Sequence, residues 1–207
     1  MRHPAKYSDI LLPMLDLLLR GYETVLDPFA GTGKLRNVRP DAHLIEIEPE
    51  WAAISGATIG NALALPYSDN SIDAVCTSPT YGNRMADHHD AKDGSRRNTY
   101  KHCLGRELHQ DNSGQLQWGD KYREFHAKAW REVKRVLRPD GLFVLNISDH
   151  IRKGQVQPVT EWHITQIESM GFAVVDHFQI ETPRLRYGSN SNKRVTHESI
   201  VTFKRGI

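Results

Sequence analysis

The chain has 207 residues, 39% of them hydrophobic and 25% charged, which is the balance of one soluble globular domain with a sizeable core. Its net charge of +2 is too small to indicate a polyanionic partner by itself. Residues 10–19 are apolar but are interrupted by Pro13 and Asp16, so neither a membrane span nor a signal peptide is expected. The two cysteines, Cys76 and Cys103, cannot form a disulfide framework and indicate a reducing compartment.

The first half of the chain alternates between helical and strand patterns. Apolar residues recur at helical spacing over residues 8–20, where Ser8 can cap the helix. A second helix is expected over residues 50–59, because Pro49 suits a first helical turn. Short apolar runs predict strands at residues 24–26, 43–47 and 72–77. Residues 34–38 carry only a weak helix or turn pattern.

The second half begins with a long polar segment, residues 82–119, which is rich in His, Asp, Asn, Gly and Arg. A loop of that length in a compact domain is usually functional or disordered. Residues 121–137 then have the clearest helical pattern of the chain, and a further helix over residues 159–170 ends at Gly171. A turn is expected at residues 138–141, and strands at residues 142–147, 172–180 and 199–203.

Strands that alternate with helices predict a twisted, mostly parallel α/β sheet with helices on both faces, in a single domain over residues 1–207. The last two strands follow each other without a helix, so they are expected to be an antiparallel pair at one edge. In such sheets ligands bind at the carboxyl ends of the parallel strands. The residues that follow the first three strands are therefore expected to meet and to form the site.

Residues 25–34 are the candidate cofactor loop, with an apolar run, an acid and a turn closed by Gly31 and Gly33. Glycine lets the backbone approach a ligand closely, because it has no Cβ. A phosphate-binding P-loop would need glycine at position 28 and serine or threonine at position 35, where this chain has proline and leucine. A dinucleotide loop would need glycine or alanine at position 36, which is arginine. The loop therefore favours a cofactor without a pyrophosphate.

Four segments together resemble the S-adenosylmethionine-dependent DNA amino-methyltransferases. Asp27-Pro-Phe-Ala-Gly-Thr-Gly33 resembles their first motif, Ser78-Pro-Thr-Tyr81 their catalytic tetrapeptide, and His3-Pro-Ala-Lys6 their N-terminal cofactor motif. The run from Asn61 to Val75 is similar to the segment that precedes the tetrapeptide. The resemblance extends from residue 3 to about residue 205.

This resemblance implies a Rossmann-like class I methyltransferase fold, with the polar and basic segment 82–119 as an insertion. It implies S-adenosylmethionine as the cofactor, which becomes S-adenosylhomocysteine, and DNA as the partner. It also implies a cytoplasmic protein of a prokaryotic or phage-infected cell, of the kind found in restriction–modification systems. Whether the protein is a monomer or a homodimer stays open.

The resemblance also assigns roles to cofactor-binding residues. Asp27 would attract the ammonium of the cofactor, and the backbone of residues 30–33 would face its carboxylate. Glu46 would accept hydrogen bonds from both ribose hydroxyls, with Glu48 as the weaker alternative. Asn61 stands where the family usually has aspartate, close to the adenine amine, and keeps a carbonyl acceptor without the charge. The implied cofactor-binding residues are Lys6, Tyr7, Asp27, Pro28, Phe29, Ala30, Gly31, Gly33, Glu46, Asn61, Ala62, Leu63 and Ser78.

By the same resemblance Ser78, Pro79 and Tyr81 are the catalytic residues. The exocyclic amine of cytosine or adenine is a poor nucleophile, because its lone pair is delocalised into the ring. The Ser78 side chain and the Pro79 carbonyl would accept its hydrogens, while Tyr81 would stack on a flipped base. Serine in first place resembles the cytosine-N4 enzymes more than most adenine-N6 enzymes. Thr80 replaces a second proline, which is expected to loosen the tetrapeptide slightly without abolishing activity.

Two segments are locally basic. Residues 84–106 contain six Lys or Arg against three acids, and residues 184–205 contain six against Glu198 alone. Such segments suit a polyanion, although a solvated surface has the same composition. The polar segment 82–119 is expected to act as a mobile lid on nucleic acid, and the loop of residues 184–194 as a clamp from the other side. The candidate nucleic-acid-binding residues are Arg84, Arg96, Arg97, Tyr100, Lys101, Arg184, Arg186, Tyr187, Lys193 and Arg194.

Two other functions stay open from the sequence. An RNA methyltransferase acting on guanosine N2 would use a similar loop and tetrapeptide, although it usually has aspartate first and an added RNA-binding domain. A catalytically silent cofactor-binding module would account for Thr80 and Asn61. Methylation at carbon 5 is disfavoured, since it needs a cysteine directly after a proline. A metal site is not expected, because no zinc pattern fits the spacing of His88, His89, Asp90, His102, Cys103 and His109.

Overall fold

The computed structural model describes residues 3, 7–86, 99–183 and 194–206. They form a seven-stranded sheet of order β3-β2-β1-β4-β5-β9-β8 and a separate two-stranded hairpin, β6-β7. The strands are β1 (Val25–Asp27), β2 (His43–Glu46), β3 (Thr58–Ile59), β4 (Ile72–Thr77), β5 (Leu137–Ile147), β6 (His150–Arg152), β7 (Gln155–Gln157), β8 (Phe172–Glu181) and β9 (His197–Arg205). The helices are α1 (Leu12–Leu19), α2 (Pro49–Ser55), α3 (Tyr100–Leu104), α4 (Asp120–Val136) and α5 (Val159–Glu168), with short 3-10 helices η1 (Asp9–Leu11), η2 (Lys34–Asn37), η3 (Arg84–Ala86) and η4 (Ser113–Gln115).

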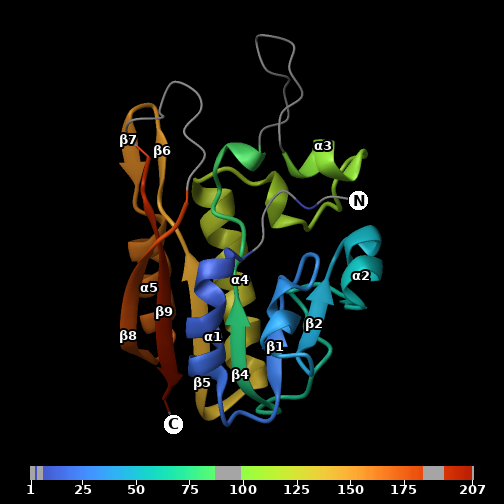
Figure 1. Cartoon of the computed structure of the whole chain (residues 1–207), viewed down its shortest axis with the longest axis vertical. Helices are drawn as coiled ribbons and strands as arrows, with labels where there is room; N and C mark the ends of the chain where they lie inside the picture. The colour runs from blue at the N-terminus through green and yellow to red at the C-terminus, as the bar shows by residue number, and fades with distance from the viewer. Residues whose placement is uncertain (1–2, 4–6, 87–98, 184–193, 207) are drawn as a thin grey trace.

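Helices cover both faces of the sheet (Figure 1). On one face Leu15 and Leu19 of α1 belong to the same buried cluster as Cys76 of β4. On the other face α4 and α5 belong to a second cluster, which contains Trp130 and Phe143. All six residues of β4 are buried, because this central strand has apolar neighbours on both sides.

The pairing within the sheet agrees with the sequence expectation. β1 pairs in parallel with β2 and with β4, and β4 pairs in parallel with β5. β9 pairs antiparallel with both β5 and β8. The predicted mostly parallel sheet with an antiparallel pair at one edge is therefore confirmed. The strand order reverses between β1 and β4, and their carboxyl ends are where such a sheet binds its ligand.

Some element boundaries differ from the sequence expectation. The helix expected over residues 50–59 ends at Ser55, because Gly56 adopts a left-handed conformation with φ 65°. The next residues form β3 beside β2. The turn expected at residues 138–141 belongs to β5, where the pairing with β4 shifts register. Ser8 makes no side-chain capping bond, so the cap predicted there is wrong.

The polar segment 82–119 contains more regular structure than its composition indicates. It holds α3, η3 and η4, while residues 87–98 lie outside the described residues. Tyr100 and Leu104 of α3 bury their side chains with Trp51 of α2. The described part of this segment is therefore packed onto the domain. The β6-β7 hairpin is a further element that the sequence pattern did not indicate.

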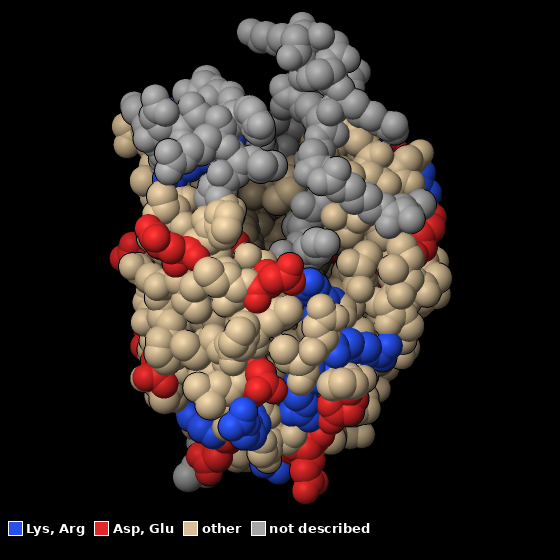
Figure 2. Space-filling view, in the orientation of Figure 1, with Lys and Arg blue, Asp and Glu red and all other residues tan. Residues whose placement is uncertain are grey.

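The described surface carries charges of both signs. In the view of Figure 2, coloured Lys and Arg side chains lie beside Asp and Glu and do not gather into a basic patch. None of the helices within the described ranges is long and apolar enough to cross a membrane.

Gly33→Ala is expected to destabilise the fold more than Gly21→Ala. Both glycines have positive φ, 74° and 86°, so alanine is strained at each. At position 33 an added Cβ would also lie 2.8 Å from the Ser55 Cβ, whereas at position 21 it would meet nothing within 4 Å. The clash should add about 1–3 kcal/mol to the loss of unfolding free energy, measured by urea denaturation. Equal losses would contradict the close packing of the loop on α2.

Candidate functional site

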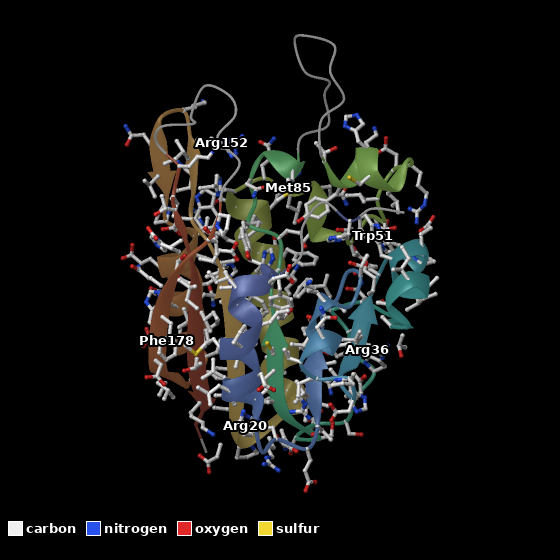
Figure 3. All side chains as sticks on the ribbon, viewed as in Figure 1. Arg20, Arg36, Trp51, Met85, Arg152 and Phe178 are labelled. Carbon is white, nitrogen blue, oxygen red and sulfur yellow. The ribbon has the colours of Figure 1, made fainter. Side chains whose placement is uncertain are left out.

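A cavity of about 260 Å³ opens where the residues following β1, β2 and β4 meet. Figure 3 shows two of its lining residues, Trp51 and Met85, toward this end of the sheet and Arg20 at the opposite end. The predicted site residues that line it are Tyr7, Pro28, Phe29, Ala30, Gly31, Glu46, Asn61, Ala62, Ser78, Pro79, Tyr81 and Tyr100. Asp27, Gly33 and Leu63 are not among the lining residues. Lys6 lies outside the described residues.

Glu46 joins the end of β2 to the glycine loop. Its Oε2 accepts a hydrogen bond from the Gly31 amide at 2.8 Å, and its Oε1 accepts one from the Glu48 amide at 2.8 Å. Gly31 has φ 53°, a conformation that favours glycine. Burial raises the pKa of Glu46 to about 7, although the two amide donors oppose this shift. The site therefore presents a buried carboxylate whose charge state changes near neutral pH.

Glu48, the alternative acid, is engaged elsewhere. Its Oε1 accepts hydrogen bonds from the His109 amide and from Asn112 Nδ2, each at 2.7 Å. Arg106 lies 2.8 Å from its Oε2. Glu48 is fully buried and does not line the cavity. Of the two acids after β2, Glu46 is thus the one in a position to contact a ligand.

Asp27 lies behind the loop. Its Oδ1 accepts from Thr77 Oγ1 at 2.6 Å and from the Phe29 amide at 3.0 Å, while the Tyr7 hydroxyl lies 3.4 Å from its Oδ2. Burial raises the pKa of Asp27 to about 6, against the opposing effect of the Thr77 bond. The carboxylate therefore links β1 to β4 and holds the start of the loop. Any attraction between this carboxylate and a ligand in the cavity acts across the loop.

Asn61 is hydrogen-bonded to an acid of the polar segment, Asp111. Its Oδ1 accepts from the Leu63 amide at 2.9 Å, and its Nδ2 donates to Asp111 Oδ2 at 3.0 Å. Asp111 also lines the cavity. A carboxylate is therefore present beside the position where the sequence has an amide in place of the expected aspartate.

The tetrapeptide Ser78–Tyr81 forms another wall of the cavity. The Tyr81 hydroxyl lies 3.3 Å from Asn146 Oδ1 and 3.2 Å from Glu198 Oε2, both of them acceptors. It also lies 3.0 Å from Ser78 Oγ. Because Tyr81 directs its single hydroxyl proton to these acceptors, Ser78 is the donor in the bond between the two hydroxyls. The Ser78 oxygen then keeps its lone pairs for a group in the cavity.

The cavity also includes residues that the sequence analysis did not predict. They include Trp51, Asp111, Ser113, Phe125 and Glu198, whereas His3, also in the lining, belongs to the N-terminal cofactor motif. A signal existed for some of them. Asp111 and Ser113 belong to the polar segment, whose length already indicated function. Glu198 is the one acid of the basic stretch 184–205.

Most of the candidate nucleic-acid-binding residues lie outside the residues that the structure describes. Tyr100 is 4% exposed, packs edge-on against Trp51 and lines the cavity, and its contact with nucleic acid stays a prediction. Lys101 pairs with Glu107, and Arg194 is half-buried. Arg84 lies in η3, but its side chain is not described. Outside the described residues are Arg96, Arg97, Arg184, Arg186, Tyr187 and Lys193.

Within the described ranges, no group of three or more His, Cys, Asp or Glu side chains is arranged to hold a metal ion. His88, His89 and Asp90 lie outside those ranges. Cys76 is fully buried, and burial raises the pKa of its thiol well above the usual value. A buried neutral thiol in a central strand is a packing residue.

Solved structures of similar fold include methyltransferases and a cyclase. The 4+2 cyclase SpnF is 15% identical, with a TM-score of 0.60 over 100% of this chain and 86% of that chain. The N-methyltransferase NodS from Bradyrhizobium japonicum WM9, in complex with S-adenosyl-L-homocysteine, is 10% identical, with a TM-score of 0.55 over 95% and 84%. A SAM-dependent methyltransferase from Methanosarcina mazei is 12% identical, with a TM-score of 0.59 over 94% and 98%. Such low identities show the fold alone.

No curated protein matches the chain significantly. A family model described as DNA methylase, the N6/N4 methyltransferase model, matches residues 72–206. This span runs from β4 to the end of β9, and so includes the tetrapeptide, Asn146 and Glu198. It covers more than half of the chain. The protein therefore belongs to the DNA amino-methyltransferase family, with a Rossmann-like methyltransferase fold and S-adenosylmethionine as its methyl donor.

Proposed function

We propose that the protein methylates an exocyclic amine of a flipped base in DNA, with cytosine N4 as the preferred target and adenine N6 as the second. One observation carries this proposal. The tetrapeptide Ser78–Tyr81 lines the same cavity as the glycine loop and Glu46, so the acceptor side and the cofactor side face one space. Family membership supports DNA as the substrate, and serine at position 78 supports cytosine N4.

The cavity fits the three parts of S-adenosylmethionine. The buried carboxylate of Glu46 suits the ribose hydroxyls, which are hydrogen-bond donors. The backbone of residues 30–31 suits the amino-acid part, with the negative charge of Asp27 behind it. The Asn61–Asp111 pair suits the adenine amine, because Asp111 supplies a carboxylate acceptor. When bound, the cofactor supplies a methyl group that its sulfonium activates.

The tetrapeptide would make the amine a better nucleophile. An amine with its lone pair in the ring reacts only as it becomes tetrahedral, so acceptors directed at its hydrogens lower the barrier. The Pro79 carbonyl and Ser78 Oγ are the two acceptors. Ser78 donates its own proton to Tyr81, which leaves its lone pairs toward the cavity. The Tyr81 ring would stack on the base while Asn146 and Glu198 hold its hydroxyl.

The test is to incubate the protein with radiolabelled S-adenosylmethionine and either unmethylated DNA or total RNA, and to identify the labelled nucleoside. We expect N4-methylcytosine from DNA. Label in RNA alone would overturn the proposal in favour of an RNA methyltransferase. Measurable cofactor binding without transfer to either polymer would indicate a silent module.

Ser78→Ala is expected to lower kcat by about 100-fold while changing the dissociation constant of S-adenosylmethionine by less than about threefold. The reason is that Ser78 contacts the acceptor amine, whereas the cofactor is held by the loop and Glu46. Calorimetry and single-turnover transfer assays measure the two quantities. Ser71→Ala, an exposed serine far from the cavity, is the matched control. Equal losses of binding and turnover would mean that Ser78 acts on the cofactor.

Cofactor affinity should fall as the pH is lowered from 8 to 5. Glu46 and Asp27, with pKa values of about 7 and about 6, are ionised at pH 8 and become protonated over this range. The ionised forms are those that accept from ribose hydroxyls and attract an ammonium, so protonation should weaken binding roughly tenfold or more at pH 5. Calorimetry across the range measures the effect. Glu46→Gln should remove the part of the dependence near pH 7, and a flat wild-type profile would contradict both roles.

A further inference from the structure

Thr80 is where the tetrapeptide departs from a second proline, and two separate groups hold it. Its Oγ1 donates to Ser113, at 3.0 Å from the side-chain oxygen and 3.2 Å from the carbonyl. Its own carbonyl oxygen accepts a hydrogen bond of 2.6 Å from the Tyr122 hydroxyl. The residue therefore has an anchor on its side chain and another on its backbone, and the second comes from α4.

The bond from Tyr122 is the last in a series of hydrogen bonds, and the chemistry of the side chains fixes which atom donates in each. Trp130 Nε1 can only donate, and it lies 3.0 Å from His163 Nδ1. His163 Nδ1 is therefore unprotonated, and the proton of the neutral ring is on Nε2. That nitrogen lies 2.9 Å from the Tyr122 hydroxyl and donates to it. Tyr122 must then give its own proton to the Thr80 carbonyl, which can only accept.

Burial keeps the side chains of this hydrogen-bond series in one protonation state. Tyr122, Trp130 and His163 are all 0% exposed, on α4 and α5, which pack on the same face of the sheet (Figure 1). Burial lowers the pKa of His163 well below its usual value and raises that of Tyr122, so both stay neutral at ordinary pH. Protonation of His163 would place a proton against the Trp130 donor and break the chain.

We propose that Tyr122 is a positioning residue for methyl transfer, and that Trp130 and His163 aim its hydroxyl at the Thr80 carbonyl. The chain of hydrogen bonds restricts the tetrapeptide as the ring of a second proline would. The next backbone carbonyl beyond the tetrapeptide, that of Gly82, is also held, by the Trp118 amide at 2.8 Å. The catalytic consequence rests on the proposed role of Ser78 and Pro79, whereas the positioning of the tetrapeptide does not.

The test is a double-mutant cycle of Tyr122→Phe with Thr80→Pro. Tyr122→Phe removes only the hydroxyl. Thr80→Pro restores a proline, and the Thr80 amide donates no hydrogen bond within the described part of the chain that a proline would remove. Tyr67→Phe is the matched control, because its hydroxyl lies 3.4 Å from His43 Nδ1 and its side chain does not line the cavity.

Two readouts are needed. The first is backbone amide NMR relaxation at positions 78 and 81 in the protein bound to S-adenosylhomocysteine. The second is kcat and the cofactor dissociation constant in the transfer assay. Tyr122→Phe should reduce order at both amides and lower kcat about tenfold with little change in cofactor affinity. In the Thr80→Pro background the same substitution should cost less than about threefold, and Tyr67→Phe should change neither readout.

Unchanged amide order in Tyr122→Phe would overturn the proposal, as would a penalty that is the same in both backgrounds. If wild-type protein transfers no methyl group to DNA, the proposed function fails, yet the NMR readout still decides the positioning claim. Ser113→Ala, which removes one partner of the Thr80 side chain, gives the same comparison if Tyr122→Phe does not fold. It should also lower amide order at position 81, and a lack of effect would count against the proposal.

Discussion

The carboxylate of Glu46 holds the glycine loop against the end of β2, and the geometry of the cavity depends on it. The two oxygens of this side chain accept from the Gly31 and Glu48 amides, so the backbones after β1 and β2 share one buried anion. Burying a carboxylate is costly unless its lone pairs are satisfied, and two amide donors reduce that cost. The remaining cost appears as a pKa raised to about 7. A ligand that donates further hydrogen bonds would lower this desolvation cost. A partly desolvated carboxylate at this position is therefore suited to bind hydroxyl groups.

The polar segment 82–119 completes the site from outside the sheet. It supplies partners for three positions of the Rossmann-like framework: Asn112 and His109 for Glu48, Asp111 for Asn61, and Ser113 for Thr80. Two of these positions, Asn61 and Thr80, are those at which the chain departs from the family pattern. At Asn61 the segment supplies the carboxylate of Asp111, and at Thr80 it supplies an acceptor for the side chain, Ser113.

The fold by itself does not decide the reaction. A cyclase and several methyltransferases share it at low sequence identity, as expected when a common scaffold carries different sites. What distinguishes this chain is the wall of the cavity opposite the glycine loop. There Ser78, Pro79 and Tyr81 follow the central strand, and Glu198 and Asn146 of the neighbouring strands hold the tyrosine. The proposed chemistry at an amine rests on that wall, because it would place acceptors beside the space where the methyl group is delivered.

The sequence by itself determined most of the sheet and its antiparallel edge, and it singled out the glycine loop and the tetrapeptide, because these depend on local patterns: apolar runs, glycines and short motifs. It also favoured Glu46 over Glu48 for the ribose. Tertiary structure alone decided which distant side chains complete these motifs. Asp111 reaches Asn61 across 50 positions and Glu198 reaches Tyr81 across 117, and no periodicity encodes such contacts. It also placed Tyr100, an expected DNA-binding residue, in a buried cluster with Trp51 that borders the cavity. Thr80, whose identity predicted a looser loop, is held at its side chain by Ser113 of η4 and at its carbonyl by Tyr122 of α4. Only tertiary packing could bring these two partners to it.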